Sequence, residues 1–367
     1  MKIIHHKFIL KFLLVFLFLL IPILYAIDGN VLKPEIHDQP LKTKIQEHRT
    51  LNYMVIGDSI GRGSGVEHAH QTWFAQLEDL MKAEYNIDMD GEYIVQSGST
   101  AFEGLYKLKN ANLKTEADMI FLVFGENDRK YMQESDFAIF YEELYRKAKM
   151  QSPSAEVFTI IESPLTYEGF ADQIKDITNY YGGTYMDMRK EFKKSGKSPK
   201  QLTKDYIHPN YIGYRLYAEK IFDVLKSFPV KSPNMLKEPK YITGDFTLTS
   251  NQEFTSQKGF TYRRGYLITK KADSRVSFNF KGTMVGAILL RGPDGGTVDV
   301  YIDGEYNSTL STWWPFPRER YIYIENGLSS GPHTIELVST GKKTKNNLTN
   351  QATVKIAGII AHVKDKE

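Results

Sequence analysis

Hydrophobic and polar positions are arranged in two different ways along the chain, and the first arrangement occupies residues 49–228. Short apolar runs such as 51–57, 119–125 and 156–163 have the composition of buried parallel strands. Between them lie longer segments with helical periodicity. Residues 71–85, for example, place several large apolar side chains on one face. Strands that alternate with helices predict a doubly wound parallel sheet with helices on both faces, an α/β domain of three layers.

The second arrangement follows residues 229–240, a segment rich in proline and lysine that has no periodicity and is predicted to be an interdomain linker. From 241 to 365, segments of strand composition follow one another, among them 275–282, 296–304 and 353–362. Turns rich in Gly, Asp, Asn and Pro separate them, and no pattern of helical length interrupts them. This part is predicted to be an all-β sandwich of the jelly-roll kind.

The first 27 residues have the pattern of an export segment. Residues 1–11 carry lysines and no acid, and residues 12–27 form an uncharged apolar run. This is the layout of a secretory signal peptide, and an uncleaved N-terminal membrane anchor is the alternative that remains open. Residues 28–48 are polar and contain prolines, so we interpret them as a stalk. Both interpretations predict an extracellular or cell-surface protein.

Composition removes several classes of function. The chain has 367 residues, of which 41% are hydrophobic and 25% charged, the balance of a globular protein. Cysteine is absent, which excludes disulfides, zinc–thiolate sites and a cysteine nucleophile. Lys2, Lys7 and Lys11 account for the whole formal net charge of +3, so the remainder is balanced and gives no indication of nucleic-acid binding.

Small and polar residues follow the predicted strands at the positions where open α/β sheets bind ligands. The first strand is followed by Gly57-Asp58-Ser59, in which the glycine permits a sharp exit and the serine hydroxyl can enter the crevice. The next strand is followed by Gln96-Ser97-Gly98-Ser99, where a glycine lets the backbone N–H approach a ligand. Each motif alone is also explained by an ordinary turn.

Two further motifs complete a set of four. An asparagine, Asn127, follows the apolar strand 119–124 and can offer its side-chain amide to a developing negative charge. Near the end of the domain, Asp205 precedes His208 by three residues. In a turn, this spacing lets the carboxylate bind Nδ1 of the histidine and leaves Nε2 free to act as a base. An Asx turn and a solvated turn are the structural alternatives.

The four motifs, taken in order, resemble the blocks of the SGNH hydrolases, also called the GDSL family, over residues 51–227. The resemblance implies a flavodoxin-like catalytic domain and a serine esterase that works through an acyl-serine. It implies Ser59 as nucleophile, His208 and Asp205 as its base and acid, and an oxyanion hole formed by Ser59, Gly98 and Asn127. It implies no metal and no cofactor.

Two positions depart from the pattern of the family. The first block reads GDSI, with Ile60 in place of leucine. The second block has Gln96 where the family usually has an asparagine two places before the glycine. The assignment of Gly98 therefore depends more on its position after the strand than on the motif.

The C-terminal part suggests the substrate. Residues 292–304 and 327–338 are similar to β-sandwich modules attached to carbohydrate esterases, which implies a carbohydrate-binding-like domain. Trp313 and Trp314 could stack on sugar rings as possible substrate-binding residues, or they could belong to the core. The leading hypothesis is an exported bacterial esterase that removes O-acyl groups, above all O-acetyl groups, from an extracellular polysaccharide or cell-wall glycan.

Two other functions use the same features. A cell-wall O-acetyltransferase would employ the same triad, and a membrane partner would then supply its acyl groups. A non-catalytic cell-surface protein that binds glycans would carry the catalytic domain as a vestige. Whether the N-terminal segment is cleaved, and whether a glycan hydroxyl or water accepts the acyl group, would discriminate between esterase and transferase.

Overall fold

The computed structural model describes residues 39–242 and 246–362. The predicted export segment, residues 1–27, and residues 28–38 of the predicted stalk lie outside these described ranges. Among the described residues, no helix combines the length and the apolar character that crossing a membrane would require.

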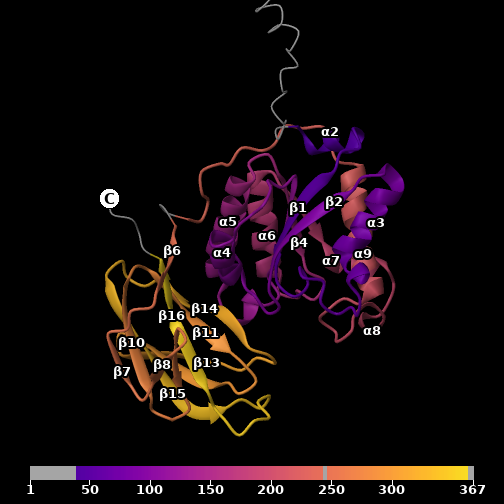
Figure 1. Cartoon of the computed structure of the whole chain (residues 1–367). Helices are drawn as coiled ribbons and strands as arrows, with labels where there is room; N and C mark the ends of the chain where they lie inside the picture. The colour runs from indigo at the N-terminus through magenta and orange to yellow at the C-terminus, as the bar shows by residue number, and fades with distance from the viewer. Residues whose placement is uncertain (1–38, 243–245, 363–367) are drawn as a thin grey trace, which may run out of the picture. The chain divides into compact units, whose positions relative to one another are not determined.

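The N-terminal domain is built on a parallel sheet of five strands in the order β2-β1-β3-β4-β5 (Figure 1). The strands are β1 (Leu51–Gly57), β2 (Met89–Val95), β3 (Met119–Val123), β4 (Glu156–Ile161) and β5 (Thr184–Asp187). Every residue of β3 is buried, which explains why its sequence is apolar throughout. The predicted doubly wound sheet is confirmed.

Helices cover both faces of this sheet. One face packs against α4 (Ala101–Lys109), α5 (Glu134–Gln151) and α6 (Glu168–Tyr181). The other packs against α3 (Trp73–Tyr85), α7 (Met188–Lys194) and α9 (Tyr211–Lys226). Shorter helical turns are η1 (Ala69–Gln71), η2 (Asp128–Lys130) and α8 (Pro199–Leu202). Each longer helix buries one apolar stripe, as its periodicity requires.

The end of the predicted stalk differs from the expectation. Residues 41–46 form a helix, α2 (Leu41–Gln46), that follows Pro40. Leu41 and Ile45 are four residues apart, so they lie on one face of this helix, and both are buried in the core beneath α3 and α9. This part of the segment therefore belongs to the catalytic domain.

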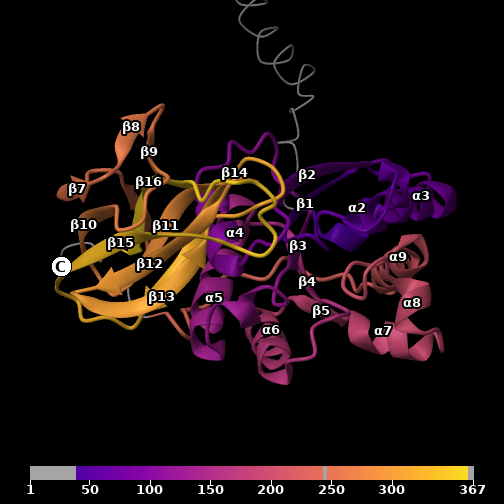
Figure 2. The same cartoon turned by 90° about the horizontal axis from the view of Figure 1, so that it is seen from below.

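The C-terminal domain consists of two antiparallel sheets (Figure 2). One has the order β13-β12-β15-β10-β7 and the other β14-β11-β16-β9-β8, with β6 paired to β16. The strands are β6 (Leu248–Asn251), β7 (Ser256–Lys258), β8 (Thr261–Arg263), β9 (Tyr266–Thr269), β10 (Arg275–Lys281), β11 (Met284–Arg291), β12 (Gly296–Ile302), β13 (Glu305–Ser311), β14 (Arg318–Asn326), β15 (Pro332–Lys343) and β16 (Val354–His362). The inner faces enclose an apolar core, which confirms the predicted sandwich.

The sandwich packs against α4 and α5 through its sheet that contains β14 and β11. Tyr323 of β14 lies edge-on to Phe102 of α4, with 6.0 Å between ring centroids, and to Phe140 of α5, at 5.4 Å. A Cβ atom on Gly286 of β11 would lie only 2.7 Å from the ring of Phe102, so a glycine is required for this close approach. The two domains thus share one apolar core.

The predicted linker is held against the catalytic domain by a buried carboxylate. Glu142 of α5 is fully buried, and its two oxygens accept the backbone N–H groups of Lys240 (2.6 Å), Tyr241 (2.7 Å) and Ile242 (3.1 Å). The hydroxyl of Tyr181 donates a further hydrogen bond of 2.7 Å. A segment of otherwise irregular structure is therefore fixed just before the sandwich begins.

We expect Glu142→Ala to lower the free energy of unfolding by about 3 kcal/mol, because hydrogen bonds to a buried charged acceptor are each worth about 1.5–3 kcal/mol and the donors left behind are partly buried. Urea denaturation of the full chain would measure this loss. Glu238→Ala, at an exposed linker residue, is the matched control and should change little. Equal effects of the two variants would contradict the anchoring role of Glu142.

Candidate active site

The turn after β1 places a serine at the carboxyl edge of the parallel sheet. A Cβ atom on Gly57 would lie 3.1 Å from the Cα of Gly61, so the chain folds back on itself closely here. The carboxylate of Asp58 accepts the backbone N–H of Ile60 at 2.7 Å and shapes the turn. Ser59 is 6% exposed. Its side chain is therefore positioned by a compact local structure rather than by a free loop.

His208 connects this serine to an acid contributed from the far end of the domain. Its Nε2 lies 2.9 Å from Oγ of Ser59, and its Nδ1 lies 2.7 Å from Oδ2 of Asp205. The other carboxylate oxygen accepts the backbone N–H of His208 at 2.8 Å. When Nδ1–H donates to Asp205, Nε2 is the ring atom that can accept the serine proton. The structure thus brings together the three predicted triad residues.

The charge of Asp205 is favoured by its partners. Partial burial raises the pKa of this carboxyl, but hydrogen bonds from the backbone and ring of His208 outweigh burial and hold the pKa below its usual value. Asp205 is therefore ionised at neutral pH and can stabilise an imidazolium beside it.

The turn that carries His208 packs on the loop after Ser59. A Cβ atom on Gly65, whose φ is +112°, would lie 2.8 Å from Cβ of His208 and 2.4 Å from the carbonyl oxygen of Pro209. The hydroxyl of Tyr214 donates to the carbonyl of Ser64 at 2.7 Å. These contacts hold the two loops at a fixed separation, although they are far apart in the sequence.

Asn127 lies beside the nucleophile loop. It follows β3 after Gly125, which adopts a φ of +132°. One N–H of its side-chain amide donates to Oδ2 of Asp58 at 2.5 Å. That bond orients the amide and leaves its second N–H available for another acceptor.

Three buried acids lie under this part of the site. Burial raises the pKa of Asp58 to about 6 and that of Asp128 to about 7. Burial and the nearby charge of Asp58 raise the pKa of Glu162 well above its usual value. Glu162 also accepts the backbone N–H of Glu126 at 2.8 Å. Sequence analysis did not find this cluster, because Glu162 belongs to none of the four motifs.

Gly98 ends the turn after β2 with a φ of +72°, a conformation that favours glycine. Its carbonyl oxygen accepts a hydrogen bond of 2.7 Å from Nη2 of Arg320, a residue of β14 in the sandwich. The same guanidinium binds both carboxylate oxygens of Glu103 in α4, at 2.7–3.1 Å. The conformation of the Gly98 loop is thus supported by the second domain, which sequence analysis did not predict.

The two tryptophans occupy different positions. A Cβ atom added to Gly98 would lie 2.9 Å from the ring of Trp314. The guanidinium of Arg320 lies 4.7 Å from the centroid of the same ring. Trp313 bonds through its backbone N–H to the hydroxyl of Ser311. Trp314 is therefore the tryptophan beside the candidate oxyanion loop. Among the described residues, no group of three side chains could hold a metal ion.

Comparisons with known proteins agree with this geometry. Residues 55–216 match the model of the GDSL-like Lipase/Acylhydrolase family. This range begins within β1 and ends within α9, so it contains all four motifs. Residues 55–216 are therefore similar to this family, in agreement with the resemblance that the sequence indicated.

Two solved structures share the arrangement of both domains. One, a two-domain esterase active on acetylated mannans and co-crystallised with mannopentaose, has a TM-score of 0.67 at 17% identity, over 87% of this chain and 93% of that one. Another structure of a two-domain esterase active on acetylated mannans has a TM-score of 0.66 at 16% identity, over 90% and 96%. At these identities the likeness concerns the fold. No curated protein sequence matches the chain.

The buried acids predict a pH dependence of stability. The folded-state pKa values of all three acids are raised. The contribution of Asp58 and Asp128 to stability is therefore fully present below about pH 4 and is lost as the pH rises through about 6–7, and that of Glu162 is lost in the same direction. We expect the urea midpoint to fall between pH 5 and pH 8. Glu162→Gln, which cannot ionise, should reduce this fall.

Urea titrations at several pH values would measure the effect in both proteins. Asp172→Asn, at an exposed carboxylate, is the control and should keep the pH profile of the parent. If Glu162→Gln has the same profile as the parent, the buried pair does not govern the pH dependence.

Proposed function

We propose that the protein is an exported serine esterase that removes O-acyl groups, above all O-acetyl groups, from an extracellular carbohydrate. The observation that carries the proposal is the continuous chain of hydrogen bonds from Ser59 through His208 to Asp205. A serine hydroxyl in contact with a histidine that an acid orients is the arrangement that activates serine for attack on an ester.

The chemistry follows from these contacts. His208 accepts the proton of Ser59 as its Oγ attacks the ester carbonyl carbon, and a tetrahedral intermediate forms. His208 then protonates the leaving sugar oxygen, which leaves an acyl-serine. Water attacks this acyl group while His208 again accepts a proton. As the second tetrahedral intermediate collapses, His208 returns that proton to Oγ of Ser59, so the acid is released and the serine is restored. The imidazolium in each step is stabilised by Asp205.

The oxyanion is assigned to three donors. The backbone N–H groups of Ser59 and Gly98 and the free amide proton of Asn127 would receive the negative oxygen. Donors held in place before reaction are effective because they need no reorganisation, and each is worth about 3–4 kcal/mol in the transition state. Asp58 holds the amide of Asn127, and Arg320 holds the carbonyl of Gly98. Both contacts support this assignment.

The assignment of a carbohydrate substrate rests on the presence of the second domain and on its position beside the Gly98 loop. The two-domain esterases of similar fold are active on acetylated mannans. In this chain an indole, Trp314, lies beside Gly98 at the candidate oxyanion loop. Flat aromatic surfaces suit the apolar faces of sugar rings. The apolar run at residues 12–27 supports export.

Ser59→Ala should lower the turnover of p-nitrophenyl acetate by at least about 10³-fold, because it removes the nucleophile. The loss should appear in kcat, and circular dichroism should show an unchanged fold. Ser195→Ala, at a serine that ends α7, is the control and should keep full activity. Substantial turnover by Ser59→Ala would contradict the assigned nucleophile.

Release of acetate would test the substrate class. The protein without residues 1–27 should liberate acetate from an acetylated polysaccharide, and its Ser59→Ala variant should not. Acetylated mannan, acetylated xylan and acetylated wall glycan would be compared under one condition. Transfer of acetyl groups to added glycan, with little free acetate, would show that the protein is a transferase. Activity on none of the polymers would contradict the carbohydrate assignment.

A further inference from the structure

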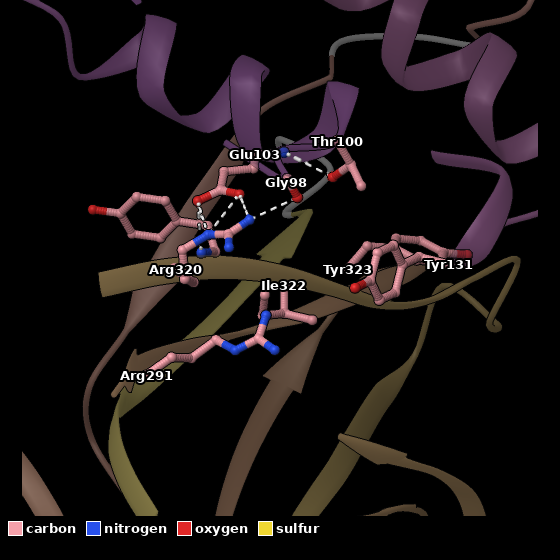
Figure 3. A pocket seen from close by; sticks show the side chains of 9 residues that line it. Gly98, Thr100, Glu103, Tyr131, Arg291, Arg320, Ile322 and Tyr323 are labelled. Atoms are coloured by element: carbon pink, nitrogen blue, oxygen red, sulfur yellow. Dashed lines mark hydrogen bonds and ion pairs between the residues drawn. The ribbon is translucent and has the colours of Figure 1, made fainter. Parts of the chain in front are cut away.

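Two arginines of the sandwich lie buried beside the Gly98 loop. Arg291 ends β11 and is 9% exposed, and Arg320 of β14 is 1% exposed. Their guanidinium carbons lie 5.2 Å and 4.7 Å from the ring centroid of Trp314. Figure 3 shows both side chains under the loop that carries Gly98 and Thr100. Arginine is rarely buried to this extent without a partner.

The positive charges at this place exceed the negative ones. Glu103 is paired with Arg320 and also lies 3.8 Å from the ammonium group of Lys107. Arg291 has no carboxylate within ion-pair distance among the described residues, and it lies near the hydroxyl of Tyr131. Burial, together with the nearby charge of Arg320, lowers the pKa of Arg291. One carboxylate therefore faces three cations.

A second acid of this region, Glu319, does not restore the balance. Glu319 of β14 accepts hydrogen bonds from the hydroxyls of Tyr266 and Tyr321. These partners hold its charge next to the two tyrosines. A buried cation without a counter-ion is costly, since its lost hydration is not replaced.

Unused donors border a small cavity at the same place. Nε of Arg291 and Nη1 of Arg320 are both buried and lack an acceptor among the described residues. Both arginines line a cavity of about 10 Å³, together with Gly98, Thr100 and the exposed Tyr131. This volume suits one group of the size of a water molecule. Fixed N–H donors with an excess of positive charge are the chemistry that recognises a carboxylate oxygen.

We propose that this cavity receives one oxygen of a carboxylate group, and that the carboxylate belongs to an acidic sugar of the glycan whose ester the protein cleaves. The proposal rests on the proposed function in that Gly98, which lines the cavity, also belongs to the candidate oxyanion hole. An acidic sugar bound here would lie next to the ester under attack. A free carboxylate ion, such as released acetate, presents the same chemistry.

The binding test uses thermal unfolding of the full chain, at constant ionic strength, with sodium glucuronate, sodium acetate or neutral glucose. Glucuronate should raise the unfolding temperature and glucose should not. Arg291→Met should weaken the apparent affinity for glucuronate by at least about tenfold, because it removes the unpaired guanidinium. Arg318→Met, at an exposed arginine of the neighbouring strand β14 that pairs with Arg291, is the matched control and should keep the response.

The substitution also separates binding from folding. Without any added anion, Arg291→Met should unfold at a higher temperature than the parent, because it replaces an uncompensated buried charge by an apolar side chain of similar length. A lower unfolding temperature would show that Arg291 has a structural role and would overturn the proposal. Arg291→Lys, which keeps the charge but loses the planar fork, should bind glucuronate less tightly than the parent.

Each outcome has one meaning. If glucuronate and glucose act alike, or if the effect of glucuronate survives Arg291→Met, the carboxylate site does not exist. If acetate alone acts, the site binds the free acid and the assignment to an acidic sugar is wrong. Repeating the titration with Ser59→Ala separates the two proposals, because anion binding does not require turnover. A parent that binds glucuronate but hydrolyses no ester would refute only the proposed function.

Discussion

The common register of β1, β2 and β3 is the constraint on which the site depends. Gly57, the last residue of β1, pairs with the last residue of β2 on one side and with that of β3 on the other. The three strands therefore end at one level, and the turns that follow them emerge at one edge. Ser59, Gly98 and Asn127 are brought to the same edge by backbone hydrogen bonds alone. A register slip would separate them.

The imidazole comes to this edge by another route. His208 precedes α9, whose packing on α3 and on the sheet sets the position of the turn. The hydrogen bond from the hydroxyl of Tyr214 to the carbonyl of Ser64 joins the beginning of α9 to the loop that follows Ser59. The short distance between Ser59 and His208 thus depends on helix packing, whereas the positions of the proposed oxyanion donors depend on strand pairing.

Much of this architecture could be predicted from the sequence, because local periodicity reports burial. The apolar run that became β3 and the amphipathic stripe that became α9 are examples. Helix α2 was not predicted, since it is only six residues long and its apolar contacts are limited to Leu41 and Ile45. The ion pair of Arg320 with Glu103 could not be predicted from the sequence either, because the partners are 217 positions apart and neither belongs to a motif.

The contact of Arg320 with Gly98 indicates that the second domain supports the candidate active site and does more than gather polymer. If the sandwich only gathered polymer, its removal would impair action on glycans and spare small esters. Its removal would in fact take away the donor to the Gly98 carbonyl and leave Glu103 buried in α4 without its guanidinium. It would also expose Phe102 and Phe140, which pack on Tyr323. A truncated chain would therefore lose the support of its Gly98 loop together with any glycan site. Substitutions of single side chains at the interface, which leave the shared core in place, are the changes that can separate glycan binding from ester chemistry.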